Sequence, residues 1–174
     1  MPDTAPKQEA KPETLEEKMR RHVATFATRR EDWDVFGFET KKDKKYARAQ
    51  RRYVGASGSV GHQDTHAIPA TCHTLSIMMV PPGHEQPMHG HETDEIFFVL
   101  EGSCTVVWEK DGERAEAVLG KWDAISSPPT ANHCIINHTD QPCWFQVMLG
   151  KAKPSRPAYT DPELTRLQDE TITG

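Results

Sequence analysis

Several features that mark common protein classes are scarce or missing in this sequence. It has no basic excess, since 21 Lys and Arg stand against 26 Asp and Glu for a net charge of −5. This gives no electrostatic basis for binding nucleic acid or an anionic membrane. The longest apolar run, IFFVL, is far too short to span a bilayer, and the N-terminus has no apolar signal-like stretch. We therefore expect a cytoplasmic protein with a small-molecule substrate, no nucleic acid and no membrane.

Cysteine is also scarce, and no C-x-x-C pair occurs. Each of the four cysteines lies in or beside a strand-like apolar segment. We therefore expect buried free thiols, as in a protein from a reducing compartment. The four are Cys72, Cys104, Cys134 and Cys143.

Polar residues concentrate at the two ends of the chain, in an N-terminal arm (1–69) and a C-terminal tail (151–174). In the arm, Thr14 and Glu17 form a capping-box pattern, and apolar residues follow at helical spacing. The pattern predicts a helix over about residues 14–29 that packs on the main body or on a dimer partner. DWDVFGF, residues 32–38, is expected to pack on the body. The basic run KKDKKYARAQRR, residues 41–52, is interpreted as a solvated linker or helix face.

The middle of the chain, about residues 70–150, is rich in short strand patterns separated by turn residues. This pattern of short strands and turns predicts a small antiparallel barrel or sandwich. Asp111-Gly112 is a strong two-residue hairpin signal. The register it sets pairs Lys110 with Glu113 and makes one face nearly all apolar. In the tail, Asp161 and Pro162 predict the cap and first turn of a short helix to about Asp169.

A cluster of candidate metal ligands comes just before IFFVL. On a strand, residues two apart point the same way, so His89 and His91 share a face, and Glu95 has the same parity. Phe97 and Val99 continue that face, which predicts that the cluster points inward. Two buried imidazoles and a carboxylate need a compensating partner, and a divalent cation supplies it. His133, after a turn, is the candidate fourth ligand.

The spacing of these residues resembles the cupin family. The first cupin motif, G-x5-H-x-H-x3-4-E-x6-G, is matched by Gly83, His89, His91, Glu95 and Gly102. The second, G-x5-P-x-G-x2-H-x3-N, is matched in part by Gly120, Pro128, His133 and Asn137. It departs from the family in carrying Thr130 in place of a glycine and two extra residues before Pro128.

The resemblance implies an all-β fold, a small antiparallel cupin (jelly-roll) barrel with an N-terminal helical extension and a short C-terminal helix. It also implies a homodimer and one divalent metal ion per chain on His89, His91, Glu95 and His133. Fe(II) or Mn(II) is favoured because either keeps coordination positions open, whereas tetrahedral Zn(II) with four protein ligands is closed. Zn(II) and Ni(II) stay open as alternatives.

This site chemistry and the resemblance together favour a metal-dependent dioxygenase that cleaves a small chelating substrate, a diketone or a phenolic or aromatic acid. A metal-dependent lyase, decarboxylase or isomerase is the alternative, and a non-catalytic metal- or ligand-binding cupin is a third. No catalytic base is identified, since Tyr46, Tyr53 and Tyr159 fall outside the predicted barrel, which disfavours a base-dependent lyase. The candidate pocket residues are Phe97, Trp108, Asn137, Gln86 and His73.

Overall fold

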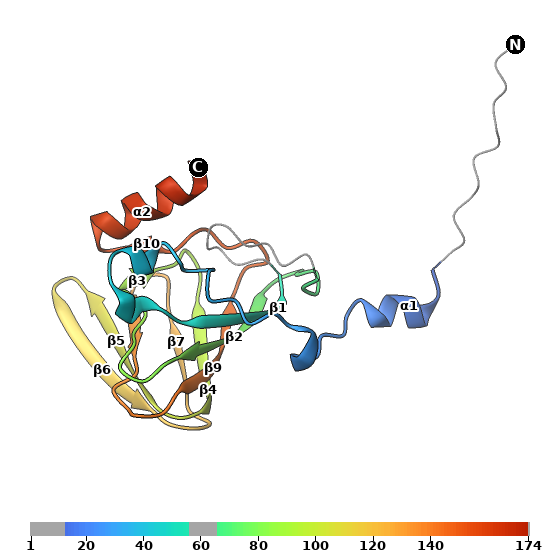
Figure 1. Cartoon of the computed structure of the whole chain (residues 1–174), viewed down its shortest axis with the longest axis horizontal. Helices are drawn as coiled ribbons and strands as arrows, with labels where there is room; N and C mark the ends of the chain where they lie inside the picture. The colour runs from blue at the N-terminus through green and yellow to red at the C-terminus, as the bar shows by residue number, and fades with distance from the viewer. Residues whose placement is uncertain (1–12, 56–65, 174) are drawn as a thin grey trace, which may run out of the picture.

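Two antiparallel five-stranded sheets form the body of the protein (Figure 1). The computed structural model describes residues 13–55 and 66–173. The strand order is β1-β2-β9-β4-β7 in the first sheet and β10-β3-β8-β5-β6 in the second. The strands are β1 (Ala49–Val54), β2 (Thr74–Val80), β3 (His89–Gly90), β4 (Glu95–Glu101), β5 (Cys104–Lys110), β6 (Glu113–Leu119), β7 (Ala124–Ser127), β8 (Asn132–Ile136), β9 (Cys143–Leu149) and β10 (Ala158–Tyr159). The all-β jelly-roll barrel predicted from the sequence is confirmed.

The hydrophobic core lies between the two sheets. Every second side chain of β2 and β9 is buried, as expected where strands present one face to the interior. Phe97 and Phe145 meet edge to face with ring centroids 5.7 Å apart. Val106 and Ile135 of the second sheet complete the same core cluster. Burial of each such side chain contributes roughly 1.5–3 kcal/mol to folding.

The β5–β6 hairpin has the register that the sequence predicts. Lys110 pairs with Glu113, and the pairing continues to Cys104 with Leu119. Asp111 and Gly112 have φ values of 52° and 82°. Positive φ at both central residues is typical of the type I′ turn, whose twist matches that of the flanking strands.

The barrel extends beyond the predicted residues 70–150, because β1 and β10 belong to its sheets. The interpretation of the basic run 41–52 as a solvated linker or helix face is therefore wrong. Its last residues form β1, in which Gln50 and Arg52 are buried. Gln50 donates a hydrogen bond to Ser76 Oγ at 3.0 Å, so its buried side-chain amide has a partner inside the fold.

The N-terminal arm has two parts. Val35, Phe36 and Phe38 are buried against the barrel, as predicted for DWDVFGF. Short 3-10 turns follow at Glu39–Lys41 and Lys44–Tyr46. Residues 1–12 and 56–65 of the predicted arm lie outside the described residues.

The predicted helix over residues 14–29 is shorter than expected. It consists of α1 (Leu15–Arg20), with a separate 3-10 turn at Phe26–Thr28. The capping box is present, with Glu17 N–H donating to Thr14 Oγ1 at 3.2 Å. None of the α1 residues is buried. A helix without a packed face is marginal at this length, which explains its early end.

The C-terminal helix α2 (Pro162–Thr173) begins where predicted and runs past Asp169. Glu163 N–H donates to the Asp161 side chain at 2.9 Å, and Leu164 and Leu167 are buried. Within the described ranges, no helix has the length and apolar character needed to cross a bilayer.

All four cysteines are free, but Cys72 is exposed, so the expectation of four buried thiols is wrong for that residue.

A comparison of two glycines tests the packing of the barrel. Both Gly102 and Gly112 have left-handed φ, but a Cβ on Gly102 would lie 2.6 Å from Pro142 O, whereas one on Gly112 meets nothing within 4 Å. Gly102→Ala should lower the free energy of unfolding by about 3 kcal/mol, and Gly112→Ala by about 1 kcal/mol. Urea unfolding followed by circular dichroism measures both, and equal losses would contradict the close packing at Gly102.

Candidate metal centre

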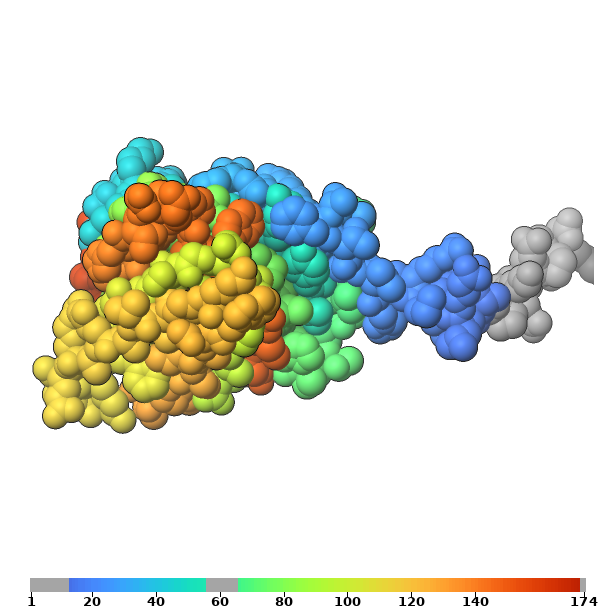
Figure 2. All heavy atoms as spheres, turned by 90° about the horizontal axis from the view of Figure 1, so that it is seen from below, coloured from blue at the N-terminus to red at the C-terminus, as the bar shows by residue number. Residues whose placement is uncertain are grey.

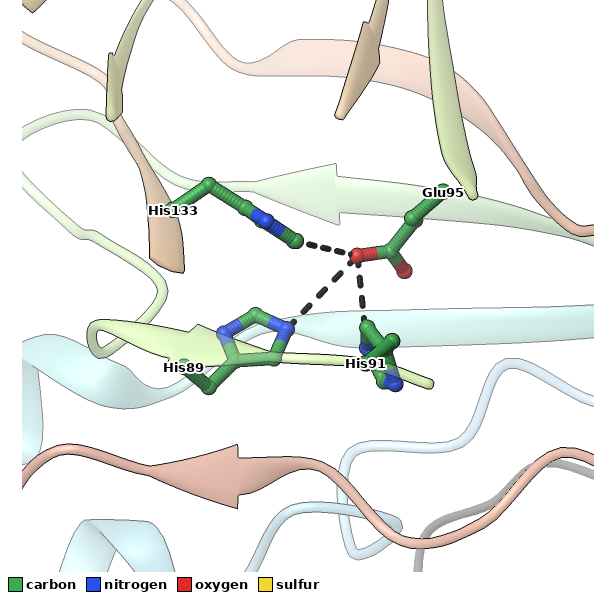
Figure 3. A group of neighbouring side chains, drawn as sticks. All are labelled: His89, His91, Glu95 and His133. Carbon is green, nitrogen blue, oxygen red and sulfur yellow. Dashed lines mark hydrogen bonds and ion pairs between the residues drawn. The ribbon is translucent and has the colours of Figure 1, made fainter. Parts of the chain in front are cut away.

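Three imidazoles converge on one carboxylate inside the barrel (Figure 3). The Nε2 atoms of His89, His91 and His133 lie 3.6, 3.3 and 2.7 Å from Glu95 Oε2. The candidate ligand atoms all lie within 4.8 Å of one another. The structure thus brings together the four residues that the sequence singled out.

The route by which the chain assembles this group differs from the one expected. His89 and His91 lie on and just after β3, whereas Glu95 begins β4 in the other sheet. The chain therefore crosses from one sheet to the other between His91 and Glu95, and shared strand parity does not unite them. His133 comes from β8, where it pairs with His89 across the β3–β8 ladder. The site spans both sheets.

Backbone carbonyls fix the orientation of two of the rings. His89 Nδ1 lies 2.8 Å from Pro87 O, and His133 Nδ1 lies 3.2 Å from Ala131 O. Donation from Nδ1–H to these carbonyls leaves each Nε2 as a lone-pair donor aimed at the centre of the group, the arrangement usual for metal-ligating histidines. The turn before His133 is closed by a hydrogen bond from Ala131 N–H to Pro128 O at 3.1 Å. Thr130 in that turn does not need the positive φ that favours glycine.

Burial and mutual proximity shift the acid–base properties of the group. Burial lowers the pKa of His89 to about 4, against the opposing influence of the Glu95 carboxylate. Burial acts to raise the pKa of Glu95, but the neighbouring imidazoles outweigh it and hold that pKa well below its usual range. The centre thus favours neutral His89 beside an ionised carboxylate, which are the protonation states that a metal ion requires.

The donor set fits a divalent transition metal. When His133 Nδ1–H donates to the Ala131 carbonyl, His133 Nε2 and Glu95 Oε2 place lone pairs 2.7 Å apart, and a cation between them removes that repulsion. His91 Nδ1 is buried without a hydrogen-bond partner. Three imidazole nitrogens and one carboxylate oxygen suit Fe, Mn, Ni or Zn. The group can therefore hold one metal ion.

A cavity of about 40 Å³ opens beside the group. Three of the candidate ligands form part of its wall. The other lining residues are Phe36, Arg48, Gln50, Met78, Gln86, Pro157 and Tyr159. Five of these, Phe36, Arg48, Gln50, Pro157 and Tyr159, come from the segments before and after the predicted barrel.

A buried ion pair in the N-terminal segment accepts a hydrogen bond from a tyrosine hydroxyl of the C-terminal segment, which joins the two segments that close the cavity. Arg48 donates to both carboxylate oxygens of Glu39, and the Tyr159 hydroxyl donates to Glu39 Oε1. Tyr159 pairs with His89 across the β10–β3 ladder. Burial and the nearby Glu39 carboxylate raise the pKa of Tyr159 well above its ordinary value, which keeps the phenol protonated. The expectation that Tyr159 lies outside the barrel is wrong, because β10 is too short to carry a strand pattern in the sequence.

The predicted pocket residues lie in different places. Gln86 lines the cavity, with Nε2 3.3 Å from His89 Nε2 and Oε1 buried without a partner. Phe97 packs its ring edge against His133, with centroids 5.7 Å apart. Trp108 pairs with His133 in the sheet but faces a separate groove near the β5–β6 turn, and it donates to Ser127 Oγ at 3.0 Å.

The remaining two predicted residues do not line the cavity. Asn137 is buried and uses its side-chain amide to bond three backbone carbonyls, which ties the β8–β9 turn to the end of β2. His73 lies beside Cys72 Sγ at 3.2 Å, before β2 begins. Nothing in the sequence marks Arg48 and Glu39 as buried, since charged residues in a polar arm are ordinarily solvated. Tyr159, just before the capped start of α2, was the one residue whose position in the sequence could have pointed to the segment that closes the cavity.

Residues 76–149 match the family model of the cupin domain. These residues form a cupin domain. A cupin 2 domain-containing protein from Halorhodospira halophila aligns with a TM-score of 0.53 and 20% identity, over 71% of this chain and 79% of that one. Oxalate decarboxylase from Bacillus subtilis, described with Mn(II) centres, aligns with a TM-score of 0.50 and 17% identity.

The oxalate decarboxylase alignment covers 60% of this chain and 26% of that one. Peruvianin-I, a cysteine peptidase from Thevetia peruviana latex, aligns at 17% identity and a TM-score of 0.46 over 48% of this chain and 53% of that one. No curated protein matches the sequence. At these identities the two structures with TM-scores of 0.50 or more show a shared fold and not a shared reaction.

Removal of the carboxylate tests the metal centre. Glu95→Gln keeps the shape of the side chain but takes away its charge, so affinity for Mn(II) or Fe(II) should fall by more than about 100-fold. His138→Ala, an exposed histidine one residue after Asn137, is the matched control and should bind as the parent does. Elemental analysis and metal titration measure both. A full equivalent of tightly bound metal in the Glu95→Gln variant would contradict the assignment.

Proposed function

We propose that the protein is a metal-dependent cupin enzyme, a mononuclear Fe(II) or Mn(II) dioxygenase that cleaves a small chelating substrate. The observation that supports this is the convergence of four candidate ligands, His89, His91, Glu95 and His133, of which the first three line a cavity. A bound Fe(II) or Mn(II) ion would supply Lewis acidity, electron transfer and open coordination positions. The cavity supplies the space for a substrate next to those positions.

The dimensions of the cavity favour one of the substrate classes considered. A volume of about 40 Å³ holds only a few water-sized groups. A short diketone or a small oxo acid therefore fits better than an aromatic acid. Phe36 and Met78 provide apolar surface that excludes water, and the Gln86 amide offers a polar contact for an oxygen atom of the substrate.

A metal-dependent decarboxylase or lyase is the second candidate, and Tyr159 favours it. The sequence argument against this class was the lack of a tyrosine near the site. Tyr159 lines the cavity beside His89, and its hydroxyl is held by Glu39. A protonated phenol in that place can donate a proton to a carbanion or enolate that forms when a C–C bond breaks. The fold shared with a Mn(II) oxalate decarboxylase is compatible with this chemistry.

An oxygen-uptake screen separates the candidates. Protein stripped with chelator and reloaded with Fe(II) or Mn(II) is supplied with small diketones, 2-oxo acids and oxalate, in air and without oxygen. A dioxygenase should consume one O₂ per substrate and stop when oxygen is removed. Turnover that persists without oxygen would contradict the dioxygenase proposal and support the lyase. No turnover of any substrate under either condition would contradict both proposals.

Tyr159→Phe gives a second test, with Tyr53→Phe on the outer sheet face as the matched control. For a dioxygenase, kcat should change by less than about fivefold, because no proton is required from this position. For a lyase, kcat should fall by roughly 10²–10⁴-fold, the usual contribution of a positioned acid or base. Metal content measured in parallel shows whether a loss of activity arises from a lost ion.

A further inference from the structure

The N-terminal arm carries four apolar residues that are largely exposed in the described part of the chain, here called the apolar stripe. Leu15, Met19, Val23 and Phe26 are 83%, 60%, 59% and 57% exposed. α1 projects away from the barrel, and the space-filling view shows it as a separate protrusion (Figures 1 and 2). Leu15 and Met19 lie on α1, and Val23 and Phe26 follow it in the chain. Single exposed apolar residues are ordinary on protein surfaces, but four within one short segment mark an interaction site.

The outer face of the first sheet is apolar as well. In an antiparallel sheet with one face on the core, the other face is normally polar. In β2, however, the inward Thr74 and Ser76 alternate with the outward Leu75 and Ile77. A groove of about 600 Å³ runs over this face, lined by Phe26, Tyr53, Leu75, Ile77, Leu100, Glu101 and Trp144. Glu101, its one charged lining residue, is paired with Lys121 at 2.8 Å.

The stripe and the groove meet at Phe26. This residue lines the groove, and the Arg51 guanidinium lies 4.2 Å from the centre of its ring. From there the chain leads toward α1 away from its own sheet (Figure 1). The segment before Phe26 therefore leaves the groove of its own barrel and carries Leu15 and Met19 away from it.

We propose that Leu15, Met19 and Val23 of the apolar stripe dock in the outer-sheet groove of a second copy of this chain. Each copy offers one stripe and one groove, so a two-fold arrangement covers both surfaces in both molecules, as an isologous interface does. Packing would also stabilise α1, which is too short to be stable alone. This inference is independent of the proposed function.

The charges on α1 favour a protein surface over a membrane. Glu16 and Glu17 balance Lys18 and Arg20, and the Glu16–Arg20 pair lies on the exposed helix surface. Helices that bind anionic lipid carry an excess of Lys and Arg on the polar face. The groove likewise offers no phosphate-binding cluster, since its one charged lining residue is acidic.

Sedimentation velocity on the full chain, at a series of concentrations, tests the interface. The parent should be a dimer, and Leu15→Glu with Met19→Glu should weaken its association by at least about 100-fold. Both side chains are exposed in the single chain, so circular dichroism and metal content should stay unchanged. Glu16→Ala with Arg20→Ala alters the polar surface of the same helix and should change the dissociation constant by less than about threefold.

A photo-crosslinking experiment identifies the occupant of the groove. The photoreactive residue p-benzoylphenylalanine replaces Met19, and chains with light and heavy nitrogen are mixed before irradiation. Crosslinks between light arm peptides and heavy peptides that contain Leu75 or Trp144 support the proposal. Crosslinks within one isotope alone place the arm on its own barrel and overturn it. A monomeric parent, a dimer that survives the double Glu substitution, or binding to anionic vesicles by a monomer would overturn it as well.

Discussion

Three buried imidazoles around one carboxylate oxygen are the constraint on which the rest of the structure depends. Such a group is costly to bury unless each ring is held in one orientation and a positive charge sits among the lone pairs. The barrel meets the first requirement for two of the rings through the carbonyls of Pro87 and Ala131, which accept from His89 and His133. It also brings β3, β4 and β8 together from both sheets, so the centre connects the two halves of the fold.

The candidate metal ligands and the segments that close the cavity come from different parts of the chain. All four candidate ligands lie within the cupin domain, residues 76–149. The segments outside it contribute Phe36 and Arg48 from one side and Pro157 and Tyr159 from the other. Glu39 joins the two sides by accepting from Arg48 and Tyr159. On this view, the common domain sets the metal chemistry, while the flanking segments set the size and polarity of what can reach it.

Patterns with a fixed spacing could be predicted from the sequence. The register of the Asp111-Gly112 hairpin follows from the alternation of apolar residues in its own two strands. The histidines and Glu95 follow a motif of fixed spacing, which holds although the chain crosses from one sheet to the other between them. The parity argument for placing Glu95 beside the histidines was nevertheless incorrect, because it treated two strands as one. The motif gave the right residues because it records a three-dimensional arrangement without depending on how the chain makes it.

Elements whose stability comes from tertiary partners could not be predicted. The composition of β1 is typical of a solvated segment, yet Gln50 and Arg52 are buried. Gln50 can be buried because Ser76, 26 residues later in the chain, accepts its hydrogen bond. β10 has two residues and forms only because β3 lies beside it. The opposite error occurred in α1, where a good amphipathic pattern predicted a long helix but no surface of the same chain packs against it. In each case the deciding contact is remote in sequence.

The most direct measurement of the central claim is anomalous X-ray diffraction from crystals of protein purified without added metal and then loaded with Mn(II) or Fe(II). The account predicts a single ion per chain, bound by Nε2 of His89, His91 and His133 and by the carboxylate of Glu95. An ion bound elsewhere in the chain, or metal-saturated crystals with no anomalous peak between these four side chains, would contradict it.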